Sequence, residues 1–242
     1  MPSELVQILS HPVKLEILKV IKTQPEPVDR IAEKVDISVQ ETTIHLDSLH
    51  EVGLVDKESD GTYRSGPLGH LTLSILLDFD FVAAHFEYFR DLELSLLPLF
   101  FVERLGELKE SERMEGAVNN LQYTERVFER AEKSIWVVAN EVMLDAVPVV
   151  RDRISKGADF RFIIDQTFKP PAGFEITMPQ FWRRIWKIPA ATVVTDKEAV
   201  VFFLNRKLKV DYSIAFSSKE PTFMKWCTDL VDYLWNHGQK VE

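Results

Sequence analysis

The side chains that could catalyse a reaction or hold a metal ion are few, and they match no common catalytic motif. The single cysteine, Cys227, excludes an internal disulfide and any zinc site built from several cysteines. The sequence has no GxSxG, P-loop, GxGxxG or HExxH pattern. Solvated charges and a packed histidine explain the one group of potential metal ligands better than a metal does: Asp78, Asp80, His85 and Glu87. We therefore predict no enzyme activity, no metal and no cofactor.

A second group of polar residues favours ligand binding. Two buried strands are predicted at 135–139 and 160–164, and a polar pair follows each of them. Ligands bind outside the carboxyl ends of strands in open parallel sheets. Aromatic and basic residues alternate over 181–187, which would suit closure over an anionic or planar molecule. The predicted effector site therefore comprises Asn140, Glu141, Asp165, Gln166, Trp182 and Arg184.

The tryptophans at 182 and 186 have a second interpretation. They lie one helical turn apart, so both could instead anchor the core or an interface. The strand-end polar residues could likewise be ordinary surface groups. The sequence leaves these alternatives open.

The elements that must position this site alternate strands with helices. A helix near 147–155 ends at Gly157 and joins the two strands, which predicts a parallel sheet with a right-handed crossover. Further strands are expected at 192–195, 199–204 and 212–216, and a last helix at 221–235. We predict an α/β domain over 131–242 with a mostly parallel sheet.

The N-terminal part predicts a different fold. Apolar residues at helical spacing indicate a helix that begins near Pro12 with Ser10 as its cap, and a second helix over 28–35. A third helix would begin after Ser38 and end at Gly53. Residues 54–57 and 62–64 then form a hairpin around a turn at 59–61. Three helices and a hairpin in this order predict a winged helix-turn-helix over residues 1–67.

That fold predicts contact with double-stranded DNA. The third helix would enter the major groove, where Gln40 could contact adenine and Thr43 a phosphate or a thymine methyl group. Lys57 and Arg64, on the hairpin or wing, would contact phosphates, which positions the protein without specifying a sequence. The predicted DNA-binding residues are Ser38, Gln40, Glu41, Thr43, Ile44, Lys57, Tyr63 and Arg64. The alternative is that these are solvated surface residues.

The net charge favours an alternative to DNA binding. The chain carries a net charge of −9, and residues 1–66 hold twelve acidic and seven basic side chains, a net of −5. Proteins that bind DNA through bulk charge are basic. Glu41 and Asp47 on the third helix would repel phosphates unless they face cytosine amines or turn away. A winged domain that binds protein instead of DNA is therefore a serious alternative.

The middle stretch, 68–130, is apolar and helical. Its large side chains need more cover than one small domain supplies, so we predict a connector that forms a homodimer. Packing against the C-terminal domain alone would also cover them. The charged run 107–113 is the expected hinge or exposed connection. The N-terminal residues lack the basic and then apolar pattern of a signal peptide, and no membrane span is apparent in the sequence. We therefore expect a cytoplasmic protein.

Two resemblances support this organisation. The run His11-Pro12-Val13-Lys14-Leu15-Glu16-Ile17-Leu18 resembles the first helix of archaeal ArsR-like regulators, and the segment Ser38–Val55 resembles their recognition helix running into the wing. The cysteine metal-sensing motif of that family is missing. Segment 131–165 and the closing Phe223, Trp226, Leu230 and Trp235 resemble the "middle domain" of archaeal methanogenesis-type regulators.

The same strand-helix-strand segment is similar to the phospholipase-D-like half-domain of TrmB-like, sugar-sensing archaeal regulators. Phospholipase D chemistry needs an HxK pattern, and no histidine here has a lysine two residues on. A phosphodiesterase-like enzyme is therefore the weakest alternative. The resemblances imply a dimeric, DNA-binding transcription regulator with an α+β two-domain fold and a C-terminal effector-sensing domain.

Overall fold

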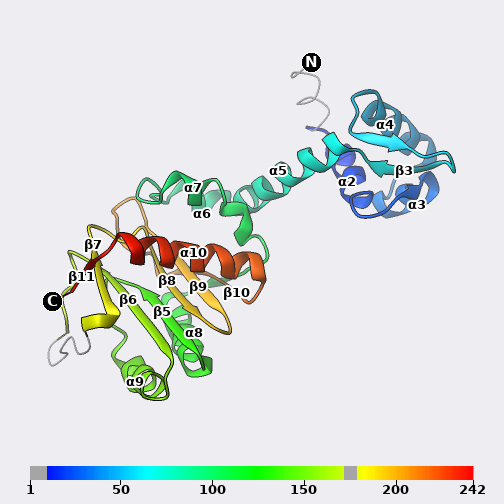
Figure 1. The fold of residues 1–242 in the computed structure, drawn as a ribbon. Coiled ribbons are helices and arrows are strands. Elements are labelled where there is room, and N and C mark those ends of the chain that lie inside the picture. The colour runs from blue at the N-terminus through cyan, green and yellow to red at the C-terminus, as the bar shows by residue number, and fades with distance from the viewer. Residues whose placement is uncertain (1–9, 172–178, 242) are drawn as a thin grey trace. The chain divides into compact units, whose positions relative to one another are not determined.

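A computed structural model describes residues 10–171 and 179–241 of the chain (Figure 1). The chain forms two compact units, Met1–Phe79 and Asp80–Glu242. The expected separate connector over 68–130 differs from this division, because everything after Phe79 belongs to the second unit. Phe81, Tyr88 and Phe101 bury their rings in the core of that unit. Burial of this apolar surface attaches the middle stretch to the C-terminal unit.

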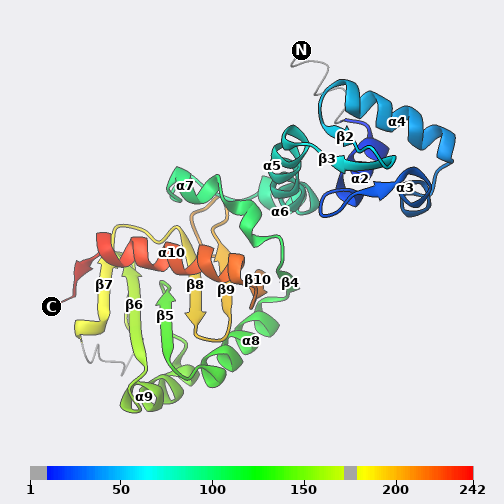
Figure 2. The same cartoon turned by 45° about the vertical axis from the view of Figure 1, so that its right-hand side comes forward.

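The first unit has the element order of a winged helix-turn-helix, as predicted. Its three strands form a small antiparallel sheet in the order β1-β3-β2. The elements are α2 (Pro12–Val20), β1 (Glu26–Pro27), α3 (Val28–Val35), α4 (Val39–Glu51), β2 (Val55–Lys57), β3 (Thr62–Ser65) and α5 (Pro67–Ala84), of which α5 continues beyond the unit. Figure 2 shows α4 lying along the outside of this unit.

Local signals set the ends of the helices. α2 begins at Pro12 as expected, but its N-cap is His11 without a side-chain hydrogen bond, so the expectation of a Ser10 cap is wrong. Ser38 caps α4, because its Oγ accepts a hydrogen bond from the Glu41 backbone N–H at 3.1 Å. Gly53 adopts a φ of 78°, which lets the chain leave α4 and enter β2.

Helix α5 differs from the other described helices in its apolar surface. It is 18 residues long with a mean hydropathy of 1.3, so by length and composition alone it could cross a membrane. Among the described helices, α5 alone is long and apolar enough for this. Apolar core helices of globular proteins meet the same criterion. Leu71, Ile75 and Phe79 on α5 are each more than half exposed.

The second unit is built on one eight-stranded sheet in the order β11-β7-β6-β5-β8-β9-β10-β4. Its strands are β4 (Glu112–Glu115), β5 (Ser134–Val138), β6 (Asp159–Asp165), β7 (Trp182–Ile185), β8 (Ala190–Thr195), β9 (Ala199–Phe203), β10 (Ile214–Ser218) and β11 (Gln239–Lys240). Its helices are α6 (Phe86–Arg90), α7 (Leu99–Val102), η1 (Leu105–Leu108), α8 (Ala117–Arg130), η2 (Leu144–Ala146), α9 (Val147–Ser155), η3 (Pro179–Phe181) and α10 (Pro221–His237).

The sheet is mixed and mostly antiparallel, so the prediction of a mostly parallel sheet is wrong. Among the strands that the structure describes, only the β5–β6 and β6–β7 pairs are parallel. The predicted β5-α9-β6 unit is present, but residues 196–198 alone connect β8 to β9. A connection this short closes a hairpin and cannot make a parallel crossover. β4 also joins the sheet from before residue 131, outside the predicted domain boundary.

The two faces of the sheet have different covers. Trp136, Arg161 and Arg183 lie on the face covered by α10, where the Arg161 guanidinium is 4.1 Å from the Trp136 ring centroid. Arg183 lies 4.0 Å from the ring of Trp235 on α10. Since side chains alternate along a strand, the intervening residues on β5, β6 and β7 point to the opposite face. Figure 2 shows α10 running across the strands.

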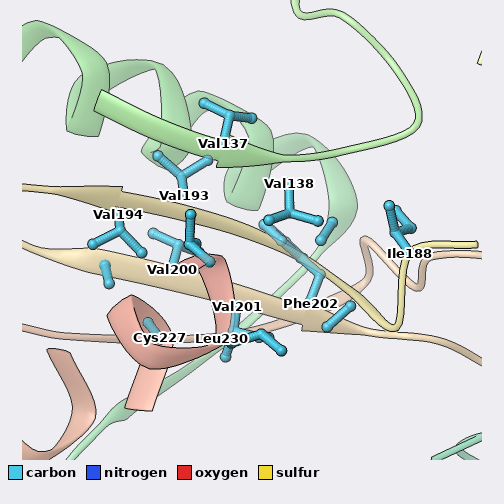
Figure 3. Packing of buried hydrophobic residues seen from close by; sticks show 14 of the residues in the cluster. Val137, Val138, Ile188, Val193, Val194, Val200, Val201, Phe202, Cys227 and Leu230 are labelled. Carbon is cyan, nitrogen blue, oxygen red and sulfur yellow. The ribbon is translucent and has the colours of Figure 1, made fainter. Parts of the chain in front are cut away.

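Beneath α10 lies a fully buried part of the core. Trp226 is fully buried, packs edge-on to Phe101 and Phe203, and donates a hydrogen bond from Nε1 to the Phe101 carbonyl at 3.1 Å. Figure 3 shows Leu230 of α10 next to Val201 of β9. These contacts hold α10 on this face and leave the opposite face to α8 and α9.

An ion pair to a buried carboxylate fixes α8 to the sheet. Glu198, which is fully buried just before β9, accepts hydrogen bonds from Arg130 at 2.6 Å and Tyr123 at 2.7 Å, both on α8. Nearby, the Asp196 carboxylate accepts backbone N–H bonds from residues 132 to 134, just before β5. Burial by itself raises the pKa of Asp196, but these donors lower it to about 2.

Candidate functional site

The outer side of α4 is the candidate nucleic-acid interface. Gln40, Glu41 and Ile44 are exposed there, with Ile44 68% exposed, as the winged-helix interpretation requires. Thr43 is half-buried, and its hydroxyl donates to the Val39 carbonyl at 2.8 Å. Ser38 uses its oxygen as the helix cap. Of the predicted helix residues, Gln40, Glu41 and Ile44 therefore have side chains that are free of the helix backbone.

The three predicted wing residues have different environments. Lys57 is exposed and its ammonium lies 5.3 Å from the Tyr63 ring centroid. Tyr63 is only 4% exposed and packs in the core of the unit, so its assignment to DNA binding is wrong. Its aromatic ring alternates inward on β3, while Arg64 points outward. Arg64 is paired with Glu58 at 2.5 Å and lies 3.6 Å from Asp56.

Most cations of the first unit are neutralised locally. Lys19, Arg30 and Lys34 form ion pairs with Glu16, Glu33 and Glu26 respectively. Among residues 10–66, Lys14, Lys22 and Lys57 have no carboxylate within ion-pair distance. Lys14 instead donates to Ser48 Oγ on α4 at 2.7 Å. The sequence count overstated the positive charge that this unit can offer to phosphates.

A second candidate site is a cavity of about 340 Å³ in the second unit. It lies between α8, α9 and the face of the sheet opposite α10. Val137, Phe162 and Trp182 are neighbours in register on β5, β6 and β7 and form part of its floor. Phe162 and Trp182 pack edge-to-face with their centroids 4.4 Å apart. The floor of the cavity is therefore apolar and aromatic.

One end of the cavity carries polar groups. Phe202 and Tyr212 line it there, with their ring centroids 5.2 Å apart, and Glu141 contributes from the loop after β5. Burial, and then the neighbouring Glu141 carboxylate, raise the pKa of the Tyr212 phenol well above its usual value. A tyrosine phenol is neutral at physiological pH, so this group can donate a hydrogen bond.

The cavity includes only two of the six predicted effector residues, Glu141 and Trp182. Asp165 is fully buried, accepts a hydrogen bond from the Thr167 backbone N–H at 2.8 Å and lies 3.4 Å from Lys187. The remaining three, Asn140, Gln166 and Arg184, are not part of the cavity wall.

Trp182 enters the cavity for a different reason from the one predicted. Residues 182–185 form strand β7, parallel to β6, and not a helix. Trp182 is 4% exposed whereas Trp186 is 77% exposed, so the two rings do not share one face. The interleaved positive charges therefore do not close over the cavity: Arg183 packs on Trp235 on the α10 side.

Sequence reasoning missed the residues of α8, α9 and β9 that complete the cavity. Phe202 and Tyr212 looked like ordinary strand residues, and the lining residues Val150 and Ile154 like one side of an amphipathic helix. The only signal was their apolar character, which core residues share. No described group of three or more His, Cys, Asp or Glu side chains could hold a metal ion.

Comparison with known proteins gave only distant likenesses. Scans of protein-family models and of curated proteins found no match. The archaeal chromatin protein TrmBL2, described as showing a novel mode of DNA binding, is 12% identical over 97% of this chain and 98% of its own, with a TM-score of 0.45. An IclR transcriptional regulator from Alicyclobacillus acidocaldarius is 13% identical over 96% and 95%, with a TM-score of 0.30.

An O-methyltransferase family protein from Burkholderia thailandensis is also similar, at 15% identity over 67% of this chain and 53% of its own, with a TM-score of 0.27. A chromatin protein, a transcriptional regulator and an O-methyltransferase family protein thus occur together among these likenesses. Identities and TM-scores this low assign neither a family nor a function to the chain.

Proposed function

We propose that the protein is a homodimeric DNA-binding transcription regulator whose second unit senses an effector. The exposed outer side of α4 carries this proposal. α4 is capped, packed on its inner side by Leu46 and Leu49, and presents Gln40 and Ile44 outward. A helix with a free outer side in a winged helix-turn-helix fits the major groove.

The available side chains favour direct contact with bases over strong attraction to phosphates. The amide of Gln40 can pair with adenine, and the methyl groups of Ile44 can contact a thymine methyl. Lys57 and Arg64 are the wing cations, and Arg64 must leave Glu58 to reach a phosphate. Because most basic side chains of the first unit are paired with carboxylates, the DNA affinity should depend less on salt concentration than is usual for DNA-binding proteins.

Two such units bound together would raise affinity and read paired half-sites. The exposed residues Leu68, Leu71, Ile75 and Phe79 on α5 follow intervals of three, four and four, the spacing of a helix that packs along another helix. We assign the dimer contact to this α5 seam. The inner side of α5 packs within its own unit through Leu73.

DNA binding is tested by fluorescence anisotropy with the protein's own upstream region across a salt series. The Lys57→Ala, Arg64→Ala double variant should weaken binding to every sequence and make the salt slope shallower by about two per subunit. Gln40→Ala should change the preference at one base position and leave the salt slope unchanged.

The control removes the same charge elsewhere: Lys133→Ala with Lys219→Ala, two exposed lysines of the second unit. If the wing variant and this control bind DNA with equal affinity, the assignment of DNA contacts to the wing is overturned. Unchanged sequence preference in Gln40→Ala would overturn the orientation of α4.

The dimer is tested by light scattering during size-exclusion chromatography. Ile75→Glu places a charge in the middle of the α5 seam and should give monomers. His70→Glu adds the same group to an exposed position of α5 outside the seam and should leave the dimer intact. A wild-type monomer at tens of micromolar would refute the α5 assignment.

A protein-binding winged unit is the second candidate, and the composition of the α4 surface favours it. Val39 and Ile44 are exposed apolar residues, and Glu41, Asp47 and Glu51 surround them with negative charge. This pattern would suit a partner with a basic rim around an apolar patch. If the wild-type protein does not bind DNA even in low salt, this candidate is favoured over the regulator.

A further inference from the structure

We propose that the cavity between α8, α9 and the sheet binds an apolar, aromatic or aliphatic small molecule that carries a neutral or cationic head group. This inference names the effector class for the second unit and rests on that part of the proposed function. It replaces the anionic ligand suggested by the alternating aromatic and basic residues, because those residues are not gathered at the cavity.

The apolar body of the ligand follows from the cavity wall. Phe160, Phe181 and Trp182 line the side formed by β6 and β7, with the Phe160 and Phe181 centroids 6.2 Å apart in an edge-to-face arrangement. Val150 and Ile154 of α9 complete the wall. A volume of about 340 Å³ lies at the lower end of the usual range for small-molecule sites. The aromatic edges suit a planar or branched apolar group.

The head group follows from the charges. Three carboxylate residues, Glu125, Glu141 and Asp145, line the cavity against a single basic residue, Arg151. An anionic ligand would leave water for a surface of mostly negative charge, which is unfavourable. The phenol of Tyr212 and the carboxylate of Glu141 both line the cavity. The carboxylate is an acceptor and the phenol is a donor for an amine or a hydroxyl group.

The openness of the cavity also points to a ligand site rather than to a packing defect. Lining residues such as Leu144 and Glu141 are exposed, so the cavity is a concave surface that a small molecule can reach. The wall uses both helices and at least four strands, β5, β6, β8 and β9, so it is a feature of the whole unit. The buried Glu198 contacts with Arg130 and Tyr123 hold α8 in place over it.

A matched series of probes tests the class. These are 2-(biphenyl-4-yl)ethylamine, 2-(biphenyl-4-yl)ethanol and biphenyl-4-ylacetic acid, which share one apolar body and differ in the charge of the head group. Isothermal titration of the full chain without DNA should show saturable binding of the amine and the alcohol. The acid should bind at least tenfold more weakly. Tighter binding of the acid than of the amine would refute the head-group assignment.

Two variants test the location. Val150→Trp fills the cavity from α9 and should abolish binding of all probes, with its melting temperature checking that it folds. Glu141→Gln changes an exposed side chain and should weaken the amine about fivefold while leaving the alcohol unchanged. Glu129→Gln is the matched control, since Glu129 is exposed on α8 and does not line the cavity.

Each outcome is decisive. No saturable binding of any probe to the wild type, or binding that survives in Val150→Trp, would overturn the site. An equal response of Glu141→Gln and Glu129→Gln would overturn the role of Glu141. Because DNA is absent from these titrations, their failure leaves the α4 interface standing, and failure of the DNA experiments leaves the cavity standing.

Discussion

The two units of this protein place their candidate sites in opposite ways. In the first unit the site is an outer surface: α4 buries Leu46 and Leu49 and leaves Gln40 and Ile44 exposed. In the second unit the site is a partly open cavity between two helices and a sheet. A surface site needs only one well-formed helix, whereas a cavity needs many elements in register. The second site should therefore be far more sensitive to packing than the first.

All five tryptophans lie in the second unit, so their fluorescence reports that unit alone. Far-UV circular dichroism reports the helices of both. Comparing the two signals during unfolding separates the stability of one unit from that of the other, and each prediction below uses this difference.

The largest expected effect is on the core beneath α10. Trp226→Ala removes a fully buried ring and its hydrogen bond to Phe101, and should lower the free energy of unfolding of the second unit by about 3–5 kcal/mol. Urea unfolding followed by tryptophan fluorescence measures it. Trp186→Ala, at a ring that is 77% exposed, is the control and should change stability little. Equal losses in the two variants would contradict the core described here.

An intermediate effect is expected from the carboxylate that precedes β9. Asp196 is 14% exposed and its pKa is lowered from 3.8 to about 2, so its charge stabilises the second unit by about 2 kcal/mol. A lowered pKa gives stability that is fully present above pH 3.8 and is lost as the pH falls through 2. Asp196→Asn should therefore be less stable than wild type at pH 7.

The difference between Asp196→Asn and wild type should shrink as the pH falls from about 4 towards 2, when unfolding is followed by tryptophan fluorescence. The exposed Glu129→Gln serves as a control for loss of one charge. A difference that is independent of pH would mean that the charge of Asp196 does not contribute.

The smallest effect belongs to the surface site. Ser38→Ala removes the cap of α4 and should destabilise the first unit by about 1 kcal/mol. The loss should appear in circular dichroism and be absent from tryptophan fluorescence. Ser38→Asp keeps a capping oxygen and should restore stability. A loss that appears equally in both signals would show that the two units unfold together, against the division described here.

The contrast between the units also explains what could be predicted. Residues 10–66 follow local rules, since Pro12, Ser38 and Gly53 start or stop helices through their own backbone or side chain. Tyr63 was misassigned because strand alternation, which decides its inward direction, depends on the register of β3 against β2 and β1.

In the second unit the sequence located most strands and helices but not how they pair. Residues 182–185 illustrate this, because their helical spacing and their strand conformation are both compatible with the sequence. Pairing with β6 decided between them, because it brings Trp182 beside Phe162. Likewise, nothing near Tyr212 in the sequence indicates that it meets Glu141 at one cavity.

The sequence by itself determined the winged helix-turn-helix, the Ser38 cap of α4 and the exposed stripe of that helix, because these depend on interactions between residues a few positions apart. Only the tertiary structure decided the mixed sheet, the face to which each aromatic ring points and the existence of the cavity. Those features depend on contacts between residues 137, 162, 182 and 202, and no local preference of the chain specifies how such distant segments align.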